Sequence, residues 1–139
     1  MCASDDFELE QFFVAEPQLG GYQRAHRNLE VWKRGIDLVV TVYHKTSNFP
    51  KEELYTLVSQ MRRSAISIPS NIAEGAARRS RKELLNFLNI ASGSASELDT
   101  QFVIAQRLGF LPEADPIIEE LDHVSAQLGA MMRSLRDPD

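Results

Sequence analysis

The sequence lacks the residues and segments on which several classes of protein depend. A single cysteine, Cys2, excludes an internal disulfide and any cysteine-rich zinc or iron–sulfur site. Seven glycines and six prolines among 139 residues are too few for a collagen-like or loop-rich chain. The longest largely apolar run, residues 38–43, is far shorter than the ~18–20 residues of a transmembrane helix. The acidic start has the wrong sign for a secretory or mitochondrial signal, so we expect a cytoplasmic protein without a membrane partner.

Catalytic motifs are missing as well. There is no Gly-x-Ser-x-Gly and no phosphate-binding Gly-Lys-Ser/Thr loop, and Cys2 has no predictable base nearby. Glu120 and His123 form one Glu-x-x-His pair, whereas a di-iron bundle needs two such pairs and further glutamates from two other helices. We therefore predict no catalytic, metal or cofactor site, and a metal-dependent enzyme is the least favoured functional class.

Charge is distributed unevenly along the chain. The formal net charge is −5, but residues 1–32 carry −4, residues 33–82 carry +6 and residues 83–139 carry −7. A basic middle inside an acidic protein indicates either an anionic partner or oppositely charged surfaces that meet in an assembly.

Four segments have the apolar spacing of helices, in alternating steps of three and four residues. They span residues 29–46, 51–76, 80–108 and 113–136. Ser80 and Glu83 form a capping-box pattern at the start of the third segment, and Gly109 ends it. The predicted apolar stripes are Leu29, Trp32, Ile36, Val39 and Tyr43; Leu54, Val58, Met61, Ala65, Ile68 and Ile72; Leu84, Leu88, Ala91, Ala95, Leu98, Phe102 and Ala105; and Ile117, Leu121, Val124, Leu128, Met131 and Leu135.

These stripes predict an all-α fold over residues 29–136, an antiparallel up-and-down four-helix bundle with left-handed packing. Pro69 lies inside the second helix, where it removes an amide donor and crowds the carbonyl of Ala65. Because the apolar spacing has the same phase before and after Pro69, we predict one kinked helix rather than two.

The two ends of the chain lie outside the predicted bundle. Residues 1–28 form an acidic N-terminal arm whose aromatic and aliphatic residues are followed by Gly20 and Gly21, and residues 137–139 form a tail. We expect the arm to be partly disordered; the alternative is that it docks on a neighbouring subunit.

Small and polar residues follow one another on the second and third helices. Small side chains let two helices approach closely, and we expect Asn71 to lie near the carbonyl group freed by Pro69. The favoured interpretation is a structural polar seam with buried hydrogen bonds rather than a ligand pocket. The predicted seam residues are Ser67, Pro69, Ser70, Asn71, Glu74, Ser94 and Glu97.

A set of basic residues on the second helix and at the following corner is the candidate nucleic-acid surface. Arginine suits phosphate because its planar guanidinium makes paired hydrogen bonds, and no aromatic residue alternates with these arginines, so we expect contacts with backbone phosphates rather than stacked bases. The alternative is a solvated corner balanced by acidic residues. The set comprises Arg62, Arg63, Arg78, Arg79, Arg81 and Lys82.

Five stretches between residues 28 and 111 resemble a known family, the four-helix bundle proteins encoded in intervening sequences of bacterial 23S ribosomal RNA genes. The signature-like stretch is 59–75, and the flanking matches lie at 28–33 with 49–55 and at 91–100 with 108–111. The resemblance covers residues 28–136. Residues 1–27 exceed the family's usual start, and Gly35 replaces a bulkier helical residue, which we expect to loosen the first helix by about 1 kcal/mol relative to alanine.

The resemblance implies a bundle that assembles as a homopentamer and has no assigned biochemical activity. It also implies a distant relation to the accessory proteins of diversity-generating retroelements, which are pentameric barrels that bind reverse transcriptase and RNA. The leading hypothesis is a non-enzymatic homo-oligomer with a basic surface that contacts RNA. The alternative is a protein–protein interaction or scaffold module that binds no nucleic acid.

Overall fold

The computed structural model describes residues 24–136, and these form four long helices with short helical segments between them. The long helices are α2 (Glu30–Thr46), α3 (Ser59–Ala76), α4 (Arg81–Arg107) and α5 (Ile117–Arg136). A 3-10 turn, η2 (Ala25–Asn28), precedes α2, and η3 (Lys51–Glu53) and a π-helical turn, η4 (Leu54–Val58), lead directly into α3. The predicted all-α, four-helix fold is confirmed.

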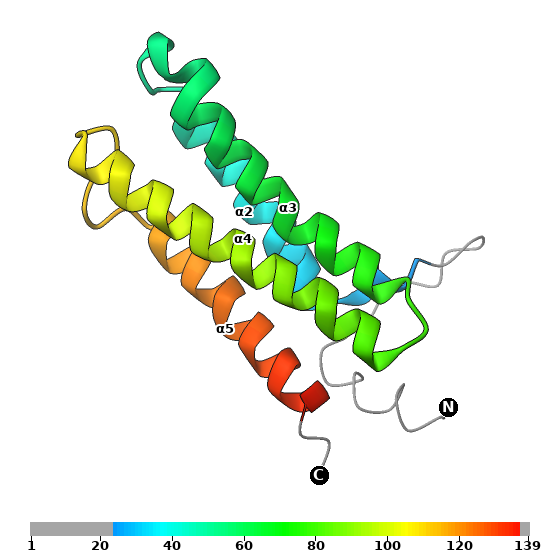
Figure 1. Ribbon diagram of the computed structural model, residues 1–139. Coiled ribbons are helices and arrows are strands. Elements are labelled where there is room, and N and C mark those ends of the chain that lie inside the picture. The colour runs from blue at the N-terminus through cyan, green and yellow to red at the C-terminus, as the bar shows by residue number, and fades with distance from the viewer. Residues whose placement is uncertain (1–23, 137–139) are drawn as a thin grey trace.

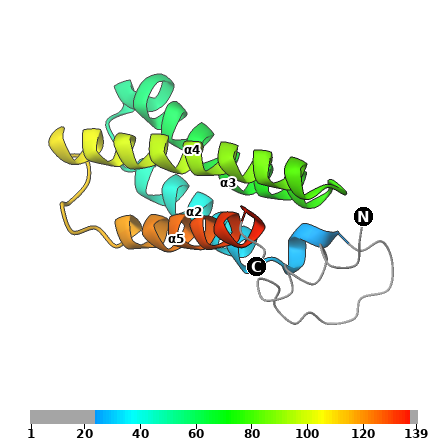
Figure 2. The same cartoon turned by 60° about the horizontal axis from the view of Figure 1, so that its bottom comes forward.

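The four helices enclose one core. α2 packs against α3 and α5, and α4 packs against the same two helices, so each helix has two neighbours. In Figure 1 the chain turns back at each connection, and consecutive helices run in opposite directions. Figure 2 shows α5 alongside α2 on the side of the bundle opposite α3 and α4. The left-handed crossing and the bend at Pro69 stay predictions.

The apolar stripes predicted for the third and fourth segments are buried at every position. All seven positions on α4, from Leu84 to Ala105, and all six on α5, from Ile117 to Leu135, are buried in the core. Their strict spacing in steps of three and four keeps each stripe on one side of its helix. These two helices therefore give the bundle its longest continuous apolar seams.

The stripe predicted for the first helix is wrong at two positions. Ile36 and Tyr43 are exposed, and the buried face of α2 instead carries Val31, Gly35, Leu38 and Val42. Gly35 has no side chain, so a count of apolar residues overlooks the buried stripe to which it belongs. α2 consequently has two apolar stripes, of which only one faces the core.

The beginning of the second predicted helix also differs from the expectation. Leu54 is exposed, although Val58, Met61, Ala65, Ile68 and Ile72 are all buried as predicted. Leu54 lies in the π-helical turn η4, where hydrogen bonds run from residue i to i+5 rather than to i+4. The wider turn rotates the side chains before Val58 out of the phase of α3. The helix itself continues through Pro69 without interruption.

Both ends of α4 are capped as the sequence indicates. The Ser80 hydroxyl accepts a hydrogen bond from the amide of Glu83 at 3.0 Å. At the other end Gly109 has a positive φ of 81°, and the amide of Phe110 donates to the carbonyl of Ala105 at 2.8 Å. This pattern is a Schellman motif, which satisfies carbonyl groups that have no partner inside the helix.

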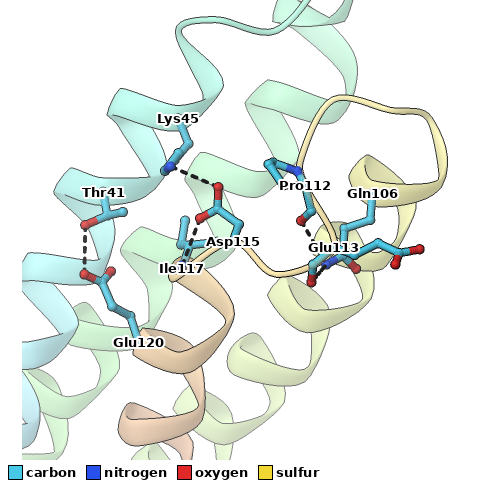
Figure 3. Close-up of polar contacts among 8 residues, drawn as sticks. All are labelled: Thr41, Lys45, Gln106, Pro112, Glu113, Asp115, Ile117 and Glu120. Carbon is cyan, nitrogen blue, oxygen red and sulfur yellow. Dashed lines mark hydrogen bonds and ion pairs between the residues drawn. The ribbon is translucent and has the colours of Figure 1, made fainter.

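The start of α5 lies four residues later than predicted, because Asp115 caps it. The Asp115 side chain accepts a hydrogen bond from the amide of Ile117 at 3.0 Å and forms an ion pair with Lys45 at 2.9 Å (Figure 3). The Gln106 side chain holds the loop before it by donating to the carbonyls of Pro112 and Glu113. Asp115 thus joins the end of α2 to the start of α5 while its side chain is only 3% exposed.

Residues 24–28, which the sequence places in the N-terminal arm, contact both α2 and α3 through η2. The ring of His26 lies edge-on against Trp32 at 5.0 Å. Burial lowers the pKa of His26, and the neighbouring charges of Arg27 and Arg24 lower it further. Residues 1–23 of the predicted arm (residues 1–28) and the tail of residues 137–139 lie outside the described residues.

Candidate nucleic-acid interface

The corner between α3 and α4 carries four of the six predicted basic residues. α3 ends at Ala76, and the amide of Arg78 donates to the carbonyl of Gly75 as the chain leaves the helix. The cap formed by Ser80 then starts α4 at Arg81. Helix end, cap and helix start lie within six residues, so the corner places Arg78, Arg79, Arg81 and Lys82 at one end of the bundle.

The four corner cations differ in how they are held. The guanidinium of Arg78 lies over the ring of Phe87 at 5.1 Å and 3.9 Å from a carboxylate oxygen of Glu74. Arg81 is half-buried. Arg79 and Lys82 are exposed and make no ion pair within residues 24–136. The corner therefore offers two cations to an external anion, beside the N-terminus of α4, where the helix dipole also favours negative charge.

Arg62 and Arg63 lie near the start of α3, far from the corner. Arg63 precedes Arg78 by 15 positions, which corresponds to about 22 Å along an α-helix. The guanidinium of Arg62 lies over the ring of Tyr43 at 4.4 Å and donates to the hydroxyl of Thr46 at 3.1 Å. Arg63 is exposed. The six predicted residues thus form two separate basic sites rather than one continuous surface.

The polar seam brings three of its seven predicted residues together between α3 and α4. The hydroxyl groups of Ser67 and Ser94 are 2.8 Å apart, and the Asn71 amide donates to the Ser67 hydroxyl at 2.9 Å. The Asn71 amide also donates to the carbonyl of Ser67 at 2.8 Å. Asn71 therefore bonds Ser67, and the structure records no bond from it to the carbonyl of Ala65 that Pro69 frees. This arrangement links the two helices through side-chain hydrogen bonds.

The other predicted seam residues lie outside that network. Pro69 is buried on the opposite face of α3, against α2. Ser70 and Glu74 are exposed, and the exposed Glu97 is 3.5 Å from the hydroxyl of Ser64 at the edge of the helix pair. Ser64, which belongs to the same run of small and polar residues on α3, is itself buried.

A comparison with protein families decides the relationship suggested by the signature residues. The family model described as 23S rRNA-intervening sequence protein matches residues 27–130. The chain belongs to this family. No curated protein sequence matches the chain significantly.

For this member of the 23S rRNA-intervening sequence protein family, the structure adds a groove that the sequence did not predict. Tyr43 of α2, Leu54 and Tyr55 of η4, and Arg63 and Ile66 of α3 line it together with Ser59 and Arg62, around a volume of about 440 Å³. The π-helical turn places Leu54 and Tyr55 at this surface, and Tyr55 is 88% exposed. A pattern analysis that assumes α-helical phase assigns Leu54 to the core and so misses the groove.

A second groove, of about 350 Å³, lies between α4 and α5 and is polar. Asp99 and Asp122 line it with Ser96, Thr100 and Ser125.

No group of three histidine, cysteine, aspartate or glutamate side chains that could hold a metal ion occurs among residues 24–136. His123 lies on the exposed face of α5, 3.3 Å from the guanidinium of Arg34 and away from the core. In the part of the chain that the structure describes, no helix is long and apolar enough to cross a bilayer.

Proposed function

We propose that this family member is a non-enzymatic assembly protein, a homopentamer whose α3–α4 corners bind RNA through backbone phosphates. The observation that carries the RNA-binding part is the pair of exposed cations, Arg79 and Lys82, that have no ionic partner within residues 24–136. A cation that already forms an ion pair with an acidic neighbour binds phosphate weakly, because the existing pair must first be broken. Arg79 and Lys82 have no such pair to break, and both lie beside a helix N-terminus.

The assembly part is supported by the second apolar stripe on α2. Ile36, Val40 and Tyr43 are exposed at a spacing of four and three residues, and Ile66 of α3 is exposed as well. Exposed apolar side chains that gather on one face mark interaction sites in soluble proteins. A neighbouring subunit that covers this stripe removes it from water, and five copies close the ring that the family resemblance implies.

Assembly and RNA binding reinforce each other in this proposal. A single corner offers two available cations, which gives a weak, strongly salt-dependent contact. In a pentamer the corner recurs five times, so a long RNA that reaches several corners binds with higher overall affinity without any new kind of contact.

Fluorescence anisotropy with labelled RNA hairpins of two unrelated sequences tests the RNA-binding part. We expect both hairpins to bind at low salt, the affinity to fall steeply as salt rises, and the Arg79→Ala/Lys82→Ala variant to bind both more weakly by the same factor. Arg107→Ala, an exposed arginine at the other end of α4, is the matched control and should bind like the unmodified protein.

Absence of binding at low salt, or equal binding by the corner variant, contradicts the RNA-binding part. That result favours the alternative of a protein–protein scaffold, for which the α2 stripe would be the contact surface. Stoichiometric iron or zinc in the purified protein would instead favour a metal-dependent enzyme.

A further inference from the structure

The groove beside the α2 stripe has a chemistry that neither the core nor the basic corner explains. Its walls are apolar and aromatic, from Tyr43, Leu54 and Ile66, and Arg63 is exposed at its edge. It lies between the C-terminal half of α2 and the beginning of α3. These two segments lie at the upper end of the bundle in Figure 1. We propose that the N-terminal residues 5–14 of a neighbouring subunit bind in this groove; the proposal rests on the assembly proposed above.

The geometry of the groove fits an extended or short helical peptide better than a sugar–phosphate backbone. Arg62 is already engaged with Tyr43 and Thr46, so its charge is fixed in place rather than available for paired bonds to phosphate. The π-helical turn holds Leu54 and Tyr55 outward, where their apolar surface would otherwise remain in water. Burying such side chains against a partner removes their apolar surface from water, which favours binding.

Residues 5–14 of the chain have the complementary chemistry. Acidic and apolar residues alternate in Asp6, Phe7, Glu8, Leu9 and Glu10, and Phe12, Phe13 and Val14 follow. The segment has four acidic residues and no basic one. Its aromatic side chains match the apolar walls of the groove, and its carboxylates match the exposed Arg63.

The length of the intervening chain permits this contact. Residues 15–23 connect the segment to the first described residue, and nine extended residues span at most about 30 Å. The groove lies near Tyr43, 13 positions beyond the start of α2 at Glu30, or about 20 Å along the helix. The connection is therefore longer than the distance along the bundle from the start of α2 to the level of the groove.

The position of the groove argues for a neighbour's segment rather than the subunit's own. Tyr43 and Ile66 belong both to the groove and to the exposed apolar face proposed as the assembly surface. A segment that reached the groove of its own subunit along the exposed stripe of α2 would cover Ile36 and Val40. That path would block the proposed assembly surface. A segment from the adjacent subunit would instead enlarge the contact area between the two subunits.

Cross-linking of the full chain tests the proposal, because Cys2 is the only cysteine and lies three residues before the segment. Lys51 is exposed and one turn from Leu54, so a short cysteine-to-lysine linker should join Cys2 to Lys51, as identified by mass spectrometry of the linked peptides. Two chains are then co-expressed, one with Lys51→Arg and the other with Cys2→Ser. In that mixture the link can form only between different chains, and we expect it to form.

Variants identify the chemistry of the contact. Phe12→Ser/Phe13→Ser in the segment and Arg63→Glu in the groove should each abolish the link. Arg133→Glu, an exposed arginine on α5, is the matched control and should leave the link unchanged. Restoring opposite charges, by combining Arg63→Glu with Glu8→Lys/Glu10→Lys, should bring the link back.

Two outcomes overturn the proposal. A link in the unmodified protein that is absent from the co-expressed pair shows that the segment binds its own subunit, and absence of the link from both shows that the groove is not its site. The sedimentation coefficient of the same samples separates the two proposals. An oligomer without the link contradicts only the docking of residues 5–14, whereas a monomer contradicts the assembly itself.

Discussion

Gly35 of α2 presents its backbone directly to the side chain of Pro69 on α3. A β-carbon added to Gly35 would lie 3.4 Å from Cβ and 3.6 Å from Cδ of the proline. Both residues are buried, and the proline ring lies next to the space that the glycine leaves. The two residues that appear least suited to a helix interior therefore form a close contact between α2 and α3, the pair of helices that also forms the groove.

Substitutions of Gly35 should separate helix propensity from packing. Gly35→Ala places a methyl group at ordinary contact distance from Pro69 and should stabilise the protein by about 0.5–1 kcal/mol, because glycine in a helix loses more backbone freedom on folding. Gly35→Leu should destabilise it by about 1–3 kcal/mol, because the larger side chain displaces the proline. Urea unfolding followed by circular dichroism measures both changes. Equal stability of the two variants would show that the contact with Pro69 is loose.

Substitutions of Gly75 on α3 and Gly93 on α4 test how closely these two helices approach each other. A β-carbon on Gly75 would lie 2.9 Å from Cβ of Phe87 and 3.0 Å from a methyl group of Leu84, whereas one on Gly93 would meet nothing within 4 Å. Gly75→Ala should therefore lower the free energy of unfolding by about 1–3 kcal/mol. Gly93→Ala, the control, should raise it by about 0.5–1 kcal/mol. A stabilising Gly75→Ala would contradict the close approach of the two helices.

Because Ser67 belongs to the seam between α3 and α4 and Ser70 does not, we expect alanine substitutions at the two serines to lower stability by different amounts. Ser67→Ala removes the hydroxyl that bonds both Ser94 and Asn71 and should destabilise the protein by about 1–2 kcal/mol, since two polar side chains lose a partner. Ser70→Ala, on the exposed side of the same helix, should change stability by less than about 0.5 kcal/mol. Thermal denaturation of the two variants side by side measures the difference. Equal melting temperatures would remove the seam from the interactions that hold α3 to α4.

The ion pair between Lys45 and Asp115 predicts a loss of stability when its cation is removed. Lys45→Met leaves a carboxylate that is 3% exposed with only the amide of Ile117 as partner, and should cost about 1–3 kcal/mol. Lys51→Met, at an exposed lysine in η3, serves as the control and should be nearly neutral. Denaturant unfolding gives both values. The lysine's role would be refuted if both variants unfolded at the same denaturant concentration.

The features that could be predicted from the sequence are those that depend on the identity and spacing of residues within one helix. The stripes of α4 and α5 consist of large apolar residues and alanines at regular spacing, and every one of them is buried. The Ser80 cap and the Gly109 termination follow from local backbone chemistry, which the sequence states directly. Such features depend on residues three or four positions apart in the chain, and these can be identified in the sequence.

The parts that did not follow depend on contacts between helices or on departures from α-helical geometry. Gly35 lies on the buried face of α2 because Pro69 occupies the space next to it, and no local pattern reveals that partner. The π-helical turn shifts the phase before Val58 and exposes Leu54. The same shift creates the groove, so the error in the core prediction and the missed site have one cause.

The candidate basic site divides for a similar reason. Arg62 and Arg78 are both arginines on or next to α3, but the helix carries them to separate sites. One lies over Tyr43 and the other over Phe87, and neither aromatic partner is near its arginine in the sequence. Charge counts along the chain therefore identified basic residues without showing which cations remain available to a partner.

The second apolar stripe of α2 predicts a variant that changes assembly without changing the fold. Val40→Asp should dissociate the oligomer, because it puts a charge on the surface proposed to be covered by a neighbour, while circular dichroism stays that of a folded helical protein. Val103→Asp introduces the same change on α4, where the valine is exposed to a similar degree, and should remain assembled. Dissociation by both variants, or by neither, would contradict the assignment of the assembly surface to α2.

Native mass spectrometry of the unmodified full chain at micromolar concentration tests the central claim most directly. We expect one dominant species with the mass of five subunits of 15.7 kDa each. A dominant species with the mass of a single subunit would contradict the proposed assembly and the function derived from it.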